Sequence, residues 1–341
     1  MPVPPAAAAL RGTRTTGGAG AAARWRRDVD PSGGAPYRLP ASFRTTPPLR
    51  KTISLAPGLS IGGDHFVVMA GPCAVENREL LMAAAEAVAA AGATMLRGGA
   101  FKPRTSPRSF QGLGLPGLEL LAEASRLTGL PVVTEVMDPR DVEVVAAHAA
   151  MLQVGSRNMQ NFPLLREVGR QTKPVLLKRG AAATLDELLH AADYIRLEGN
   201  ERVVLCERGV RSFDPSTRYL LDLAAVPVLR QRTDLPIVID PSHGTGEASL
   251  VAPMAKAALA VGADGLLIEV HAAPERALCD GKQALRPQDF AELMADLRRL
   301  MPLCARRLPR SAVAVGQHGL AAGTPPASPS PGSLDDEVIA P

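Results

Sequence analysis

Short apolar runs alternate with helix-like stretches along most of this sequence, from residue 65 onward. Eight of the runs have the length and composition of buried strands, and each precedes a stretch of helical character, such as RELLMAAAEAVAAAG. Eight βα units over about 240 residues predict a (β/α)₈ barrel. The alternative is a doubly wound open sheet, which usually has fewer strands and a GxGxxG turn where this chain has AGPCAVE. The predicted strands are HFVVMAG (65–71), TMLRGGA (94–100), PVVTEV (131–136), MLQVGS (151–156), PVLLKRG (174–180), RVVLCERG (202–209), PIVIDPSH (236–243) and GLLIEVH (265–271).

The segments on either side of the predicted barrel, residues 65–303, differ from it in composition. Residues 51–64 alternate apolar and polar side chains around Pro57 and Gly58, which predicts a β-hairpin extension. Residues 1–50 are rich in Ala, Gly, Pro and Arg, and residues 304–341 end in GTPPASPSPGSLDDEVIAP. Because both segments lack apolar periodicity, we expect them to be disordered tails.

Charge and cysteine content narrow the classes of function. The formal net charge is +4, but residues 1–50 hold eight Arg and two Asp, so this segment carries +6 and the remainder −2. The basic character therefore does not indicate a nucleic-acid-binding barrel, and no apolar run approaches the roughly 18–20 residues of a membrane span. Four cysteines without a CxxC pair favour a reducing compartment, so we expect a cytoplasmic protein. An organelle transit peptide in the Arg- and Ala-rich segment is the alternative.

Cationic side chains stand at or just after the ends of several predicted strands. In a barrel these ends converge on one face, where active sites lie. Arginine binds carboxylate and phosphate through a planar fork, and lysine adds a point charge. Six cations around one mouth therefore suit ligands that carry two phosphates and a carboxylate. They are Arg97, Lys102, Arg104, Arg157, Lys178 and Arg208.

A second group of strand-end residues has the chemistry of a metal site. Cys73, His243, Glu269 and Asp280 come from the first, seventh and eighth strands and the last loop. The first and eighth strands are neighbours in a closed barrel, so these four residues could bind one divalent metal. A buried, inert Cys73 and a helix-capping Asp280 form the alternative. Mixed soft and hard ligands do not select among Mn, Fe, Zn, Co and Cu.

Seven segments resemble one known family, the type I-beta 3-deoxy-D-arabino-heptulosonate 7-phosphate (DAHP) synthases, over residues 55–303. The resemblance implies a (β/α)₈ barrel that condenses phosphoenolpyruvate with erythrose 4-phosphate. This reaction is the first step of the shikimate pathway to chorismate and the aromatic amino acids. The segments are AGPCAVE, LRGGAFKPRTSPRSFQGLG, VGSRNMQNF, VLLKRG, ERGVRSF, IDPSHGTG and IEVHAAPERALCDGKQAL.

The resemblance assigns roles to the two groups of residues. Arg104 and Thr105 would bind the phosphate of erythrose 4-phosphate. The metal ligands would be Cys73, His243, Glu269 and Asp280. Phosphoenolpyruvate would be held by Arg97, Lys102, Arg157, Lys178 and Arg208.

The predicted catalytic residues are Cys73, Lys102, His243 and one carboxylate, Glu135, which the chemistry of the condensation adds to them. A water must add to carbon 2 of the former enol, and we expect Glu135, at the end of the third strand, to position that water, with Lys102 as the proton donor. The alternative role of Glu135 is a salt bridge to a neighbouring Arg or Lys.

Three other functions and several partners are compatible with these patterns. A 3-deoxy-D-manno-octulosonate 8-phosphate synthase, which uses arabinose 5-phosphate, would carry a KANR-type segment where this chain has KPRT at residues 102–105. An aldolase would use Lys178 as a Schiff-base nucleophile. A non-catalytic barrel could recruit chorismate mutase. We expect a homo-oligomer, a dimer or tetramer, and no fused regulatory domain, because residues 1–50 are too short for one.

Overall fold

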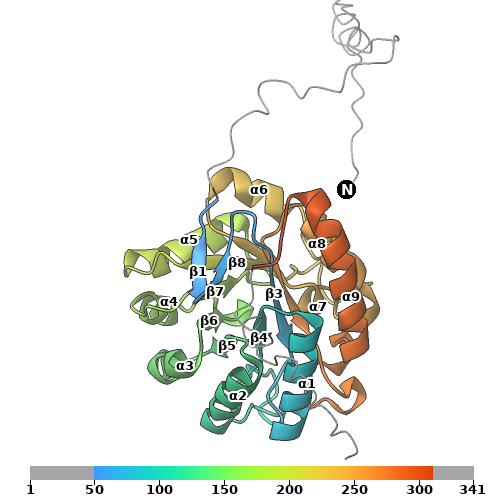
Figure 1. The fold of residues 1–341 in the computed structure, drawn as a ribbon. Coiled ribbons are helices and arrows are strands. Elements are labelled where there is room, and N and C mark those ends of the chain that lie inside the picture. The colour runs from blue at the N-terminus through green and yellow to red at the C-terminus, as the bar shows by residue number, and fades with distance from the viewer. Residues whose placement is uncertain (1–49, 310–341) are drawn as a thin grey trace, which may run out of the picture. The chain divides into compact units, whose positions relative to one another are not determined.

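The computed structural model of the chain describes residues 50–309, and eight parallel strands form a closed barrel within them. Each strand pairs with its neighbour in sequence, and β10 pairs with β3 to close the barrel (Figure 1). This topology confirms the predicted (β/α)₈ architecture. The strands are β3 (Val67–Gly71), β4 (Met95–Arg97), β5 (Val132–Val136), β6 (Met151–Val154), β7 (Val175–Lys178), β8 (Val203–Glu207), β9 (Ile237–Ile239) and β10 (Gly265–Glu269).

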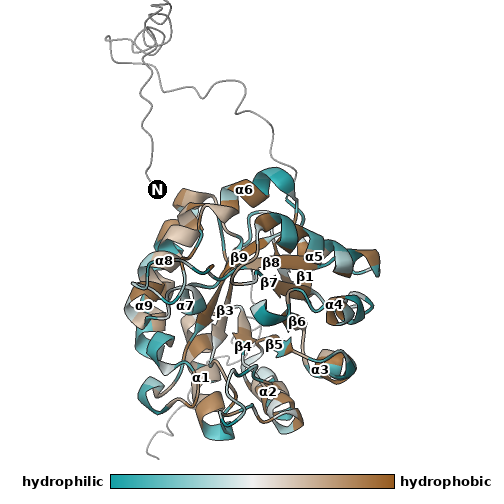
Figure 2. Cartoon of the chain, turned by 180° about the vertical axis from the view of Figure 1, so that it is seen from behind, coloured by the Kyte–Doolittle hydropathy of each residue, from teal (hydrophilic) through white to brown (hydrophobic). Residues whose placement is uncertain are grey.

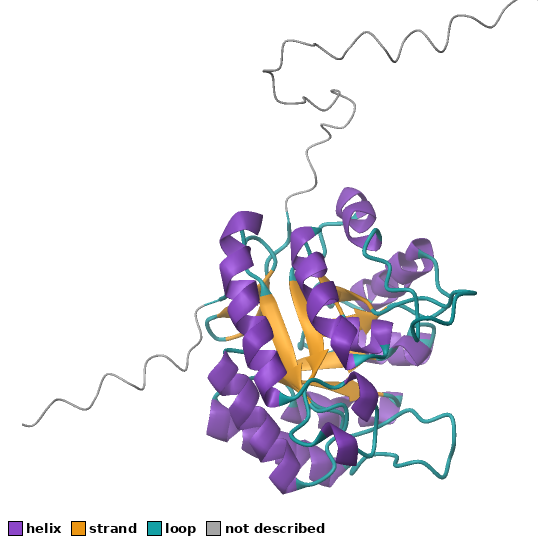
Figure 3. Cartoon of the chain, turned by 90° about the vertical axis from the view of Figure 1, so that its right-hand side faces the viewer, coloured by secondary structure: helices purple, strands orange, loops and turns teal. Residues whose placement is uncertain are grey.

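Helices surround the strands and bury their apolar faces against them (Figures 2 and 3). In α1, the side chain of Asn77 caps the first turn by accepting a hydrogen bond from the Leu80 N–H at 2.9 Å, and Gly92 ends the helix at φ 91°. Among the helices of residues 50–309, none reaches the length and apolar content that crossing a bilayer requires. The outer helices are α1 (Arg78–Ala91), α2 (Leu115–Thr128), α3 (Val142–His148), α4 (Phe162–Gly169), α5 (Leu185–Leu197), α6 (Ala225–Arg232), α8 (Ala248–Ala260) and α9 (Pro287–Leu300).

The hairpin predicted for residues 51–64 is confirmed, and it packs against the interior of the barrel. Its strands β1 (Ile53–Ala56) and β2 (Leu59–Ile61) pair antiparallel. Ile53, Leu55, Leu59 and Ile61 are buried in one apolar cluster with side chains from the barrel strands, which include Val67, Met95, Met151, Val204 and Val238. This apolar end of the barrel leaves the opposite end for polar side chains.

The seventh barrel strand is shorter than the sequence predicts. We expected a strand over residues 236–243, but β9 ends at Ile239 and the short helix α7 (Pro241–Thr245) follows it. The side chain of Asp240 caps this helix by accepting a hydrogen bond from the His243 N–H at 3.0 Å. The strand therefore ends where Asp240 and Pro241 begin a helix, and His243 is placed by α7.

The chain stays in contact with the barrel beyond residue 303, where the predicted C-terminal tail begins. The N–H of Phe66 donates to the carbonyl of Arg307 at 2.8 Å, and the Arg306 guanidinium donates to the carbonyls of Gly63 and Gly262. Residues 304–309 therefore belong with the barrel. The rest of the predicted tails, residues 1–49 and 310–341, lies outside the described residues.

Candidate active site and metal centre

A polar cavity of about 300 Å³ lies among the C-terminal ends of the barrel strands. Among the residues that line this cavity are Glu135, Thr105, His243 and Asp280. The convergence that the sequence predicts for the strand-end cations is therefore present. Its cationic lining consists of Arg97, Lys102, Arg104, Arg157, Lys178, Arg208 and one arginine that the sequence did not single out, Arg218.

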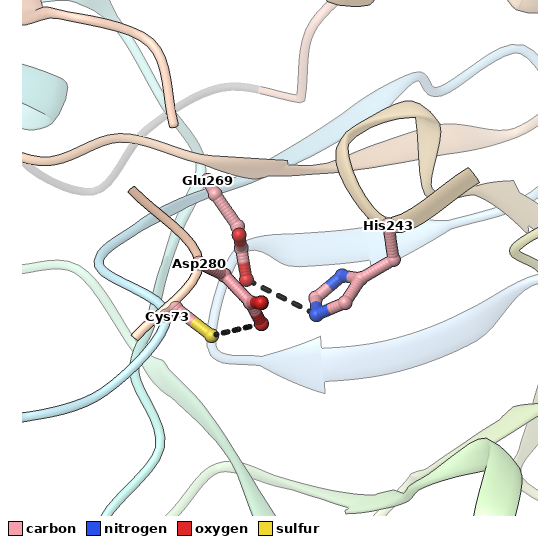
Figure 4. Close-up of side chains that lie close together, drawn as sticks. All are labelled: Cys73, His243, Glu269 and Asp280. Carbon is pink, nitrogen blue, oxygen red and sulfur yellow. Dashed lines mark hydrogen bonds and ion pairs between the residues drawn. The ribbon is translucent and has the colours of Figure 1, made fainter. Parts of the chain in front are cut away.

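The four predicted metal ligands lie together at one side of this cavity (Figure 4). One donor atom from each of Cys73, His243, Glu269 and Asp280 lies within 4.8 Å of all the others. The Cys73 Sγ is 3.3 Å from Asp280 Oδ2, and His243 Nε2 is 3.1 Å from Glu269 Oε1. A thiol, an imidazole and two carboxylates at this spacing fit a divalent transition metal. Their role as ligands stays a prediction.

Asp240 fixes the orientation of His243. Its Oδ2 atom lies 2.8 Å from His243 Nδ1 and 2.6 Å from Lys178 Nζ. Burial disfavours the charged form of Asp240, but His243 and Lys178 outweigh burial and hold its pKa well below the usual value. With Nδ1 facing Asp240, the other ring nitrogen, Nε2, faces Glu269 and the cluster.

Arginines support the two carboxylates of the cluster. Arg97 Nη1 donates to Glu269 Oε1 at 3.0 Å, and Arg218 Nη1 lies 3.3 Å from Asp280 Oδ1. Burial disfavours the charged form of Asp280, but His243 and Arg218 lower its pKa to about 2. Both carboxylates therefore stay ionised at neutral pH, because the pKa of Glu269 is lowered as well.

Lys102 connects the cluster to the cationic side of the cavity. Its Nζ atom lies 2.9 Å from Cys73 Sγ, which is also 3.4 Å from Cys279 Sγ. The hydrogen bond with Cys279 and burial raise the pKa of the Cys73 thiol. Burial opposes the charge of Lys102, but the two cysteine sulfurs outweigh burial and raise the pKa of the lysine. Lys102 is therefore a cation at neutral pH, and binding of a metal ion would favour the thiolate of Cys73.

Two of the six predicted cations are already paired inside the protein. Arg97 forms an ion pair with Glu269, and Lys178 forms one with Asp240. Buried carboxylates therefore compensate the charges of these two cations, and their role in ligand binding stays a prediction. Within residues 50–309, no carboxylate lies within ion-pair distance of the other four cations, Lys102, Arg104, Arg157 and Arg208.

Glu135 lies in the cavity wall and has an amide partner. Its Oε2 atom accepts a hydrogen bond from Gln153 Nε2 at 3.3 Å, and 8% of the residue is exposed. Over the described ranges of the chain, no Arg or Lys forms an ion pair with it, so the alternative role as a salt-bridge residue has no support. The missing side chain of Gly155 leaves the space that the Glu135 carboxylate fills, since an added Cβ would overlap Glu135 Oε1.

Some residues of the site gave little or no signal in the sequence. Arg218 lies in the long loop after β8, away from any strand end, and nothing in the local pattern indicates that its side chain turns back to Asp280. Asp240 stands at a predicted strand end, but its position alone does not reveal that it contacts Lys178 and His243. A second cavity of about 440 Å³ shares Thr105, Arg157 and Arg208 with the first and was not predicted.

Comparison with known proteins places the chain among enzymes that share this barrel. The model of the DAHP synthetase I family matches residues 46–302. A phospho-2-dehydro-3-deoxyheptonate aldolase of Thermotoga maritima is 50% identical over 242 residues, which cover 71% of this chain and 72% of the relative. A crystal structure of the T. maritima phospho-2-dehydro-3-deoxyheptonate aldolase (DAHP synthase) has a TM-score of 0.74 at 48% identity, with 76% of each chain covered. A 2-dehydro-3-deoxyphosphooctonate aldolase of Syntrophobacter fumaroxidans is 32% identical over 258 residues, 70% of this chain and 88% of that protein.

Proposed function

Because the chain belongs to the DAHP synthetase I family, we propose the residue roles below for the reaction that it catalyses. The reaction is the condensation of phosphoenolpyruvate with erythrose 4-phosphate to DAHP and phosphate, the first step of the shikimate pathway. The observation that carries the residue roles is the adjacency of two groups: a four-donor cluster and a cavity lined by seven cations, four of which have no carboxylate partner in the described chain.

The other candidate functions fit these observations less well. The octulosonate 8-phosphate relative is 32% identical, whereas the heptonate relative is 50% identical. A Schiff-base nucleophile must present its amine to the substrate, but Lys178 Nζ is buried and bonded to Asp240 Oδ2 at 2.6 Å. A barrel without catalytic function would not need all four of the side chains that could bind a metal ion.

Cys73, His243, Glu269 and Asp280 would hold one divalent metal ion. When bound, the metal supplies Lewis-acid polarisation of the aldehyde carbonyl of the sugar. Mn, Fe, Zn, Co and Cu all suit this mixed donor set. Asp240 keeps the imidazole of His243 turned toward the donors, and Arg97 holds Glu269 in place.

The cations of the cavity would bind the two phosphorylated substrates side by side. Arg104 and Thr105 bind the phosphate of erythrose 4-phosphate from the loop after β4. This arrangement turns a bimolecular encounter into a local reaction between two carbons. The phosphate and carboxylate of phosphoenolpyruvate are bound by Arg97, Lys102, Arg157, Lys178 and Arg208.

Lys102 and Glu135 would move the protons of the reaction. Carbon 3 of phosphoenolpyruvate attacks the aldehyde carbon, and the charged Lys102 donates a proton to the aldehyde oxygen as the new carbon–carbon bond forms. A water then adds to the electron-poor carbon 2, and Glu135 accepts its proton. The carbon–oxygen bond to phosphate breaks last, and the phosphate leaves with the electron pair of that bond. The hydroxyl of carbon 2 becomes a carbonyl as its proton returns to the neutral Lys102, and Glu135 passes its proton to the departing phosphate.

A phosphate-release assay tests the substrate and the metal together. We expect purified protein to release phosphate from phosphoenolpyruvate with erythrose 4-phosphate and much more slowly with arabinose 5-phosphate. Treatment with a chelator should abolish release, and added Mn²⁺ should restore it. Preference for the five-carbon sugar would overturn the substrate, and full activity after complete metal removal would overturn the metal site.

The expected partners and location stay predictions. We propose a homo-oligomer, a dimer or tetramer, in the cytoplasm, with chorismate mutase as a candidate partner. Sedimentation of the protein alone and with chorismate mutase tests the first and third of these points. A monomer that does not bind the mutase would contradict both.

A further inference from the structure

Glu76 is a buried acid that the proposed reaction does not use. It lies in the loop between β3 and α1, three residues after Cys73, and its side chain is 4% exposed. Its Oε1 atom accepts a hydrogen bond from the Leu278 N–H at 2.7 Å, and its Oε2 atom lies 3.6 Å from His271 Nε2. Glu76 does not line the cavity, so its role concerns the loop that it contacts.

That loop, residues 271–284, carries Cys279 and Asp280. Its base is closed next to β10, because the N–H of His271 donates to the carbonyl of Leu285 at 3.0 Å and the N–H of Leu285 donates to the carbonyl of Glu269 at 2.8 Å. Leu278, which bonds to Glu76, lies two residues before Asp280 and far along the loop from this base. Glu76 therefore connects the loop of Cys73 to the loop of Asp280.

The ring of His271 has a defined orientation. Its Nδ1 atom accepts a hydrogen bond from the Ala273 N–H at 3.0 Å, which leaves the ring proton on Nε2, facing Glu76. A buried carboxylate is costly unless donors surround it. Over residues 50–309, no Arg or Lys forms an ion pair with Glu76, and its one hydrogen-bond donor is the Leu278 N–H of this loop; His271 Nε2, at 3.6 Å, lies beyond hydrogen-bond distance.

We propose that Glu76 and His271 are positioning residues that hold Asp280 and Cys279 beside Cys73, and thereby set the affinity of the site for its metal. This inference rests on the proposed roles of Cys73 and Asp280 as ligands. Donors that come from two separate loops bind a metal well only if both loops are held at the correct spacing. The bond from Leu278 to a charged acceptor supplies such a restraint.

Metal affinity and thiol reactivity test the proposal without any substrate. We expect Glu76→Ala to raise the Kd for Mn²⁺, measured by calorimetry on chelator-treated protein, by about 10–100-fold. Glu76→Gln should raise it less, because the amide oxygen can still accept from Leu278 while its NH₂ group faces the His271 N–H. In the absence of metal, Cys279 should react faster with iodoacetamide in both variants, with Cys304 as the internal reference thiol.

Two controls separate positioning from a general loss of structure. Glu79→Ala removes an exposed acid on α1 that has no side-chain hydrogen bond or ion pair in the described chain, and it should leave both measurements unchanged. Thermal unfolding identifies variants that do not fold. If Glu76→Ala does not fold, the Mn²⁺ affinity and Cys279 reactivity of Glu76→Gln test the proposal. A folded Glu76 variant with wild-type Mn²⁺ affinity and wild-type Cys279 reactivity would overturn the proposal. Wild-type protein inactive with both sugars would instead contradict the proposed function.

Discussion

Asp240 illustrates how one buried side chain serves two parts of the site. It is fully buried and contacts both Lys178, a proposed phosphoenolpyruvate ligand, and His243, a proposed metal ligand. Removal of Lys178 would therefore leave a buried carboxylate with one fewer cation and would also disturb the histidine. For this reason Lys178 is a poor choice for separating the two substrate subsites. Arg104 has no carboxylate partner in the described chain, and its Nη1 atom contacts Cys279 Sγ at 2.6 Å.

Arg104→Ala should weaken binding of the sugar phosphate selectively. Loss of one charge-assisted hydrogen bond to phosphate costs about 1.5–3 kcal/mol, so KM for erythrose 4-phosphate should rise roughly 10–100-fold while KM for phosphoenolpyruvate changes little. Arg108→Ala is the matched control, because Arg108 lies in the same loop and does not line the cavity. Equal effects of Arg104→Ala on both substrates would show that the subsites are assigned wrongly.

Gly155→Ala should impair catalysis through Glu135. The added methyl group would overlap the Glu135 carboxylate, which must move out of its place in the cavity wall. Because a displacement of about 1 Å can cost 10²-fold in rate, we expect kcat to fall by up to about 100-fold with little change in KM. Steady-state kinetics and thermal unfolding of the variant check this, and a folded variant with normal kcat would remove Glu135 from the mechanism.

Oxidation should inactivate the protein when its metal has been removed. Cys73 Sγ and Cys279 Sγ are 3.4 Å apart, so a small approach brings them to the distance of about 2.05 Å at which a disulfide forms. We expect chelator-treated protein to lose activity in air and to regain it after treatment with thiol and Mn²⁺. Peptide mapping should find a Cys73–Cys279 crosslink, and Cys279→Ser should resist the loss. Inactive oxidised protein with both thiols free would contradict this prediction.

The β1–β2 hairpin stabilises the end of the barrel opposite the site. Its Ile61 side chain is fully buried in the cluster that fills this end. The proposed catalytic residues Lys102, Glu135 and His243 line the cavity at the other end of the strands. The hairpin should therefore contribute to stability and leave the reaction unaffected.

Ile61→Ala should lower the free energy of unfolding by about 2–5 kcal/mol, the range for a large-to-small change in a core. At a temperature where the variant is folded, kcat and both KM values should match those of the wild type. Ser54→Ala, at an exposed position of the same hairpin, is the control and should leave stability nearly unchanged. Denaturant unfolding and kinetics decide, and a loss of kcat in folded Ile61→Ala protein would connect the hairpin to the site.

At the scale of the whole molecule, the first residues that the structure describes, Arg50 and Lys51, contact the barrel. Arg50 Nη1 lies 3.8 Å from Asp264 Oδ1, and Lys51 both forms an ion pair with Glu201 at 3.0 Å and donates its N–H to the carbonyl of Asp234. Asp264 also pairs with Arg306 at 3.1 Å, so both ends of the described chain meet one buried carboxylate.

Because residues 1–49 lack the apolar periodicity of a folded segment, their deletion should leave kcat, KM and the melting temperature nearly unchanged. Deletion of residues 1–51 should lower the melting temperature slightly, because it removes the contacts of Arg50 and Lys51. Activity assays and thermal melts of the two truncated proteins test this. A large loss of activity or solubility after the shorter deletion would show that residues 1–49 are needed for the stability of the barrel or for its oligomerisation.

Local sequence patterns were sufficient to predict the barrel and most of the residues that converge at the site, although not Arg218 or the role of Asp240. Eight apolar runs with intervening helical stretches follow from local periodicity, and the carboxyl ends of parallel strands necessarily converge. The residues at those ends, such as Cys73, Glu135 and Glu269, could therefore be placed together without coordinates. The end of β9 was missed because an apolar run does not show where Asp240 and Pro241 turn the chain into α7.

The pairing of charged groups could be seen only in the folded barrel. The pairs Arg97–Glu269 and Lys178–Asp240 join residues far apart in sequence, and the contact of Glu76 with Leu278 spans 202 positions. Such pairings depend on side-chain direction and on distances of a few ångströms, which neither periodicity nor composition encodes. The physical reason is that secondary structure reflects interactions between near neighbours in the chain, whereas the electrostatics of the site arise from groups that only the closed barrel brings into contact.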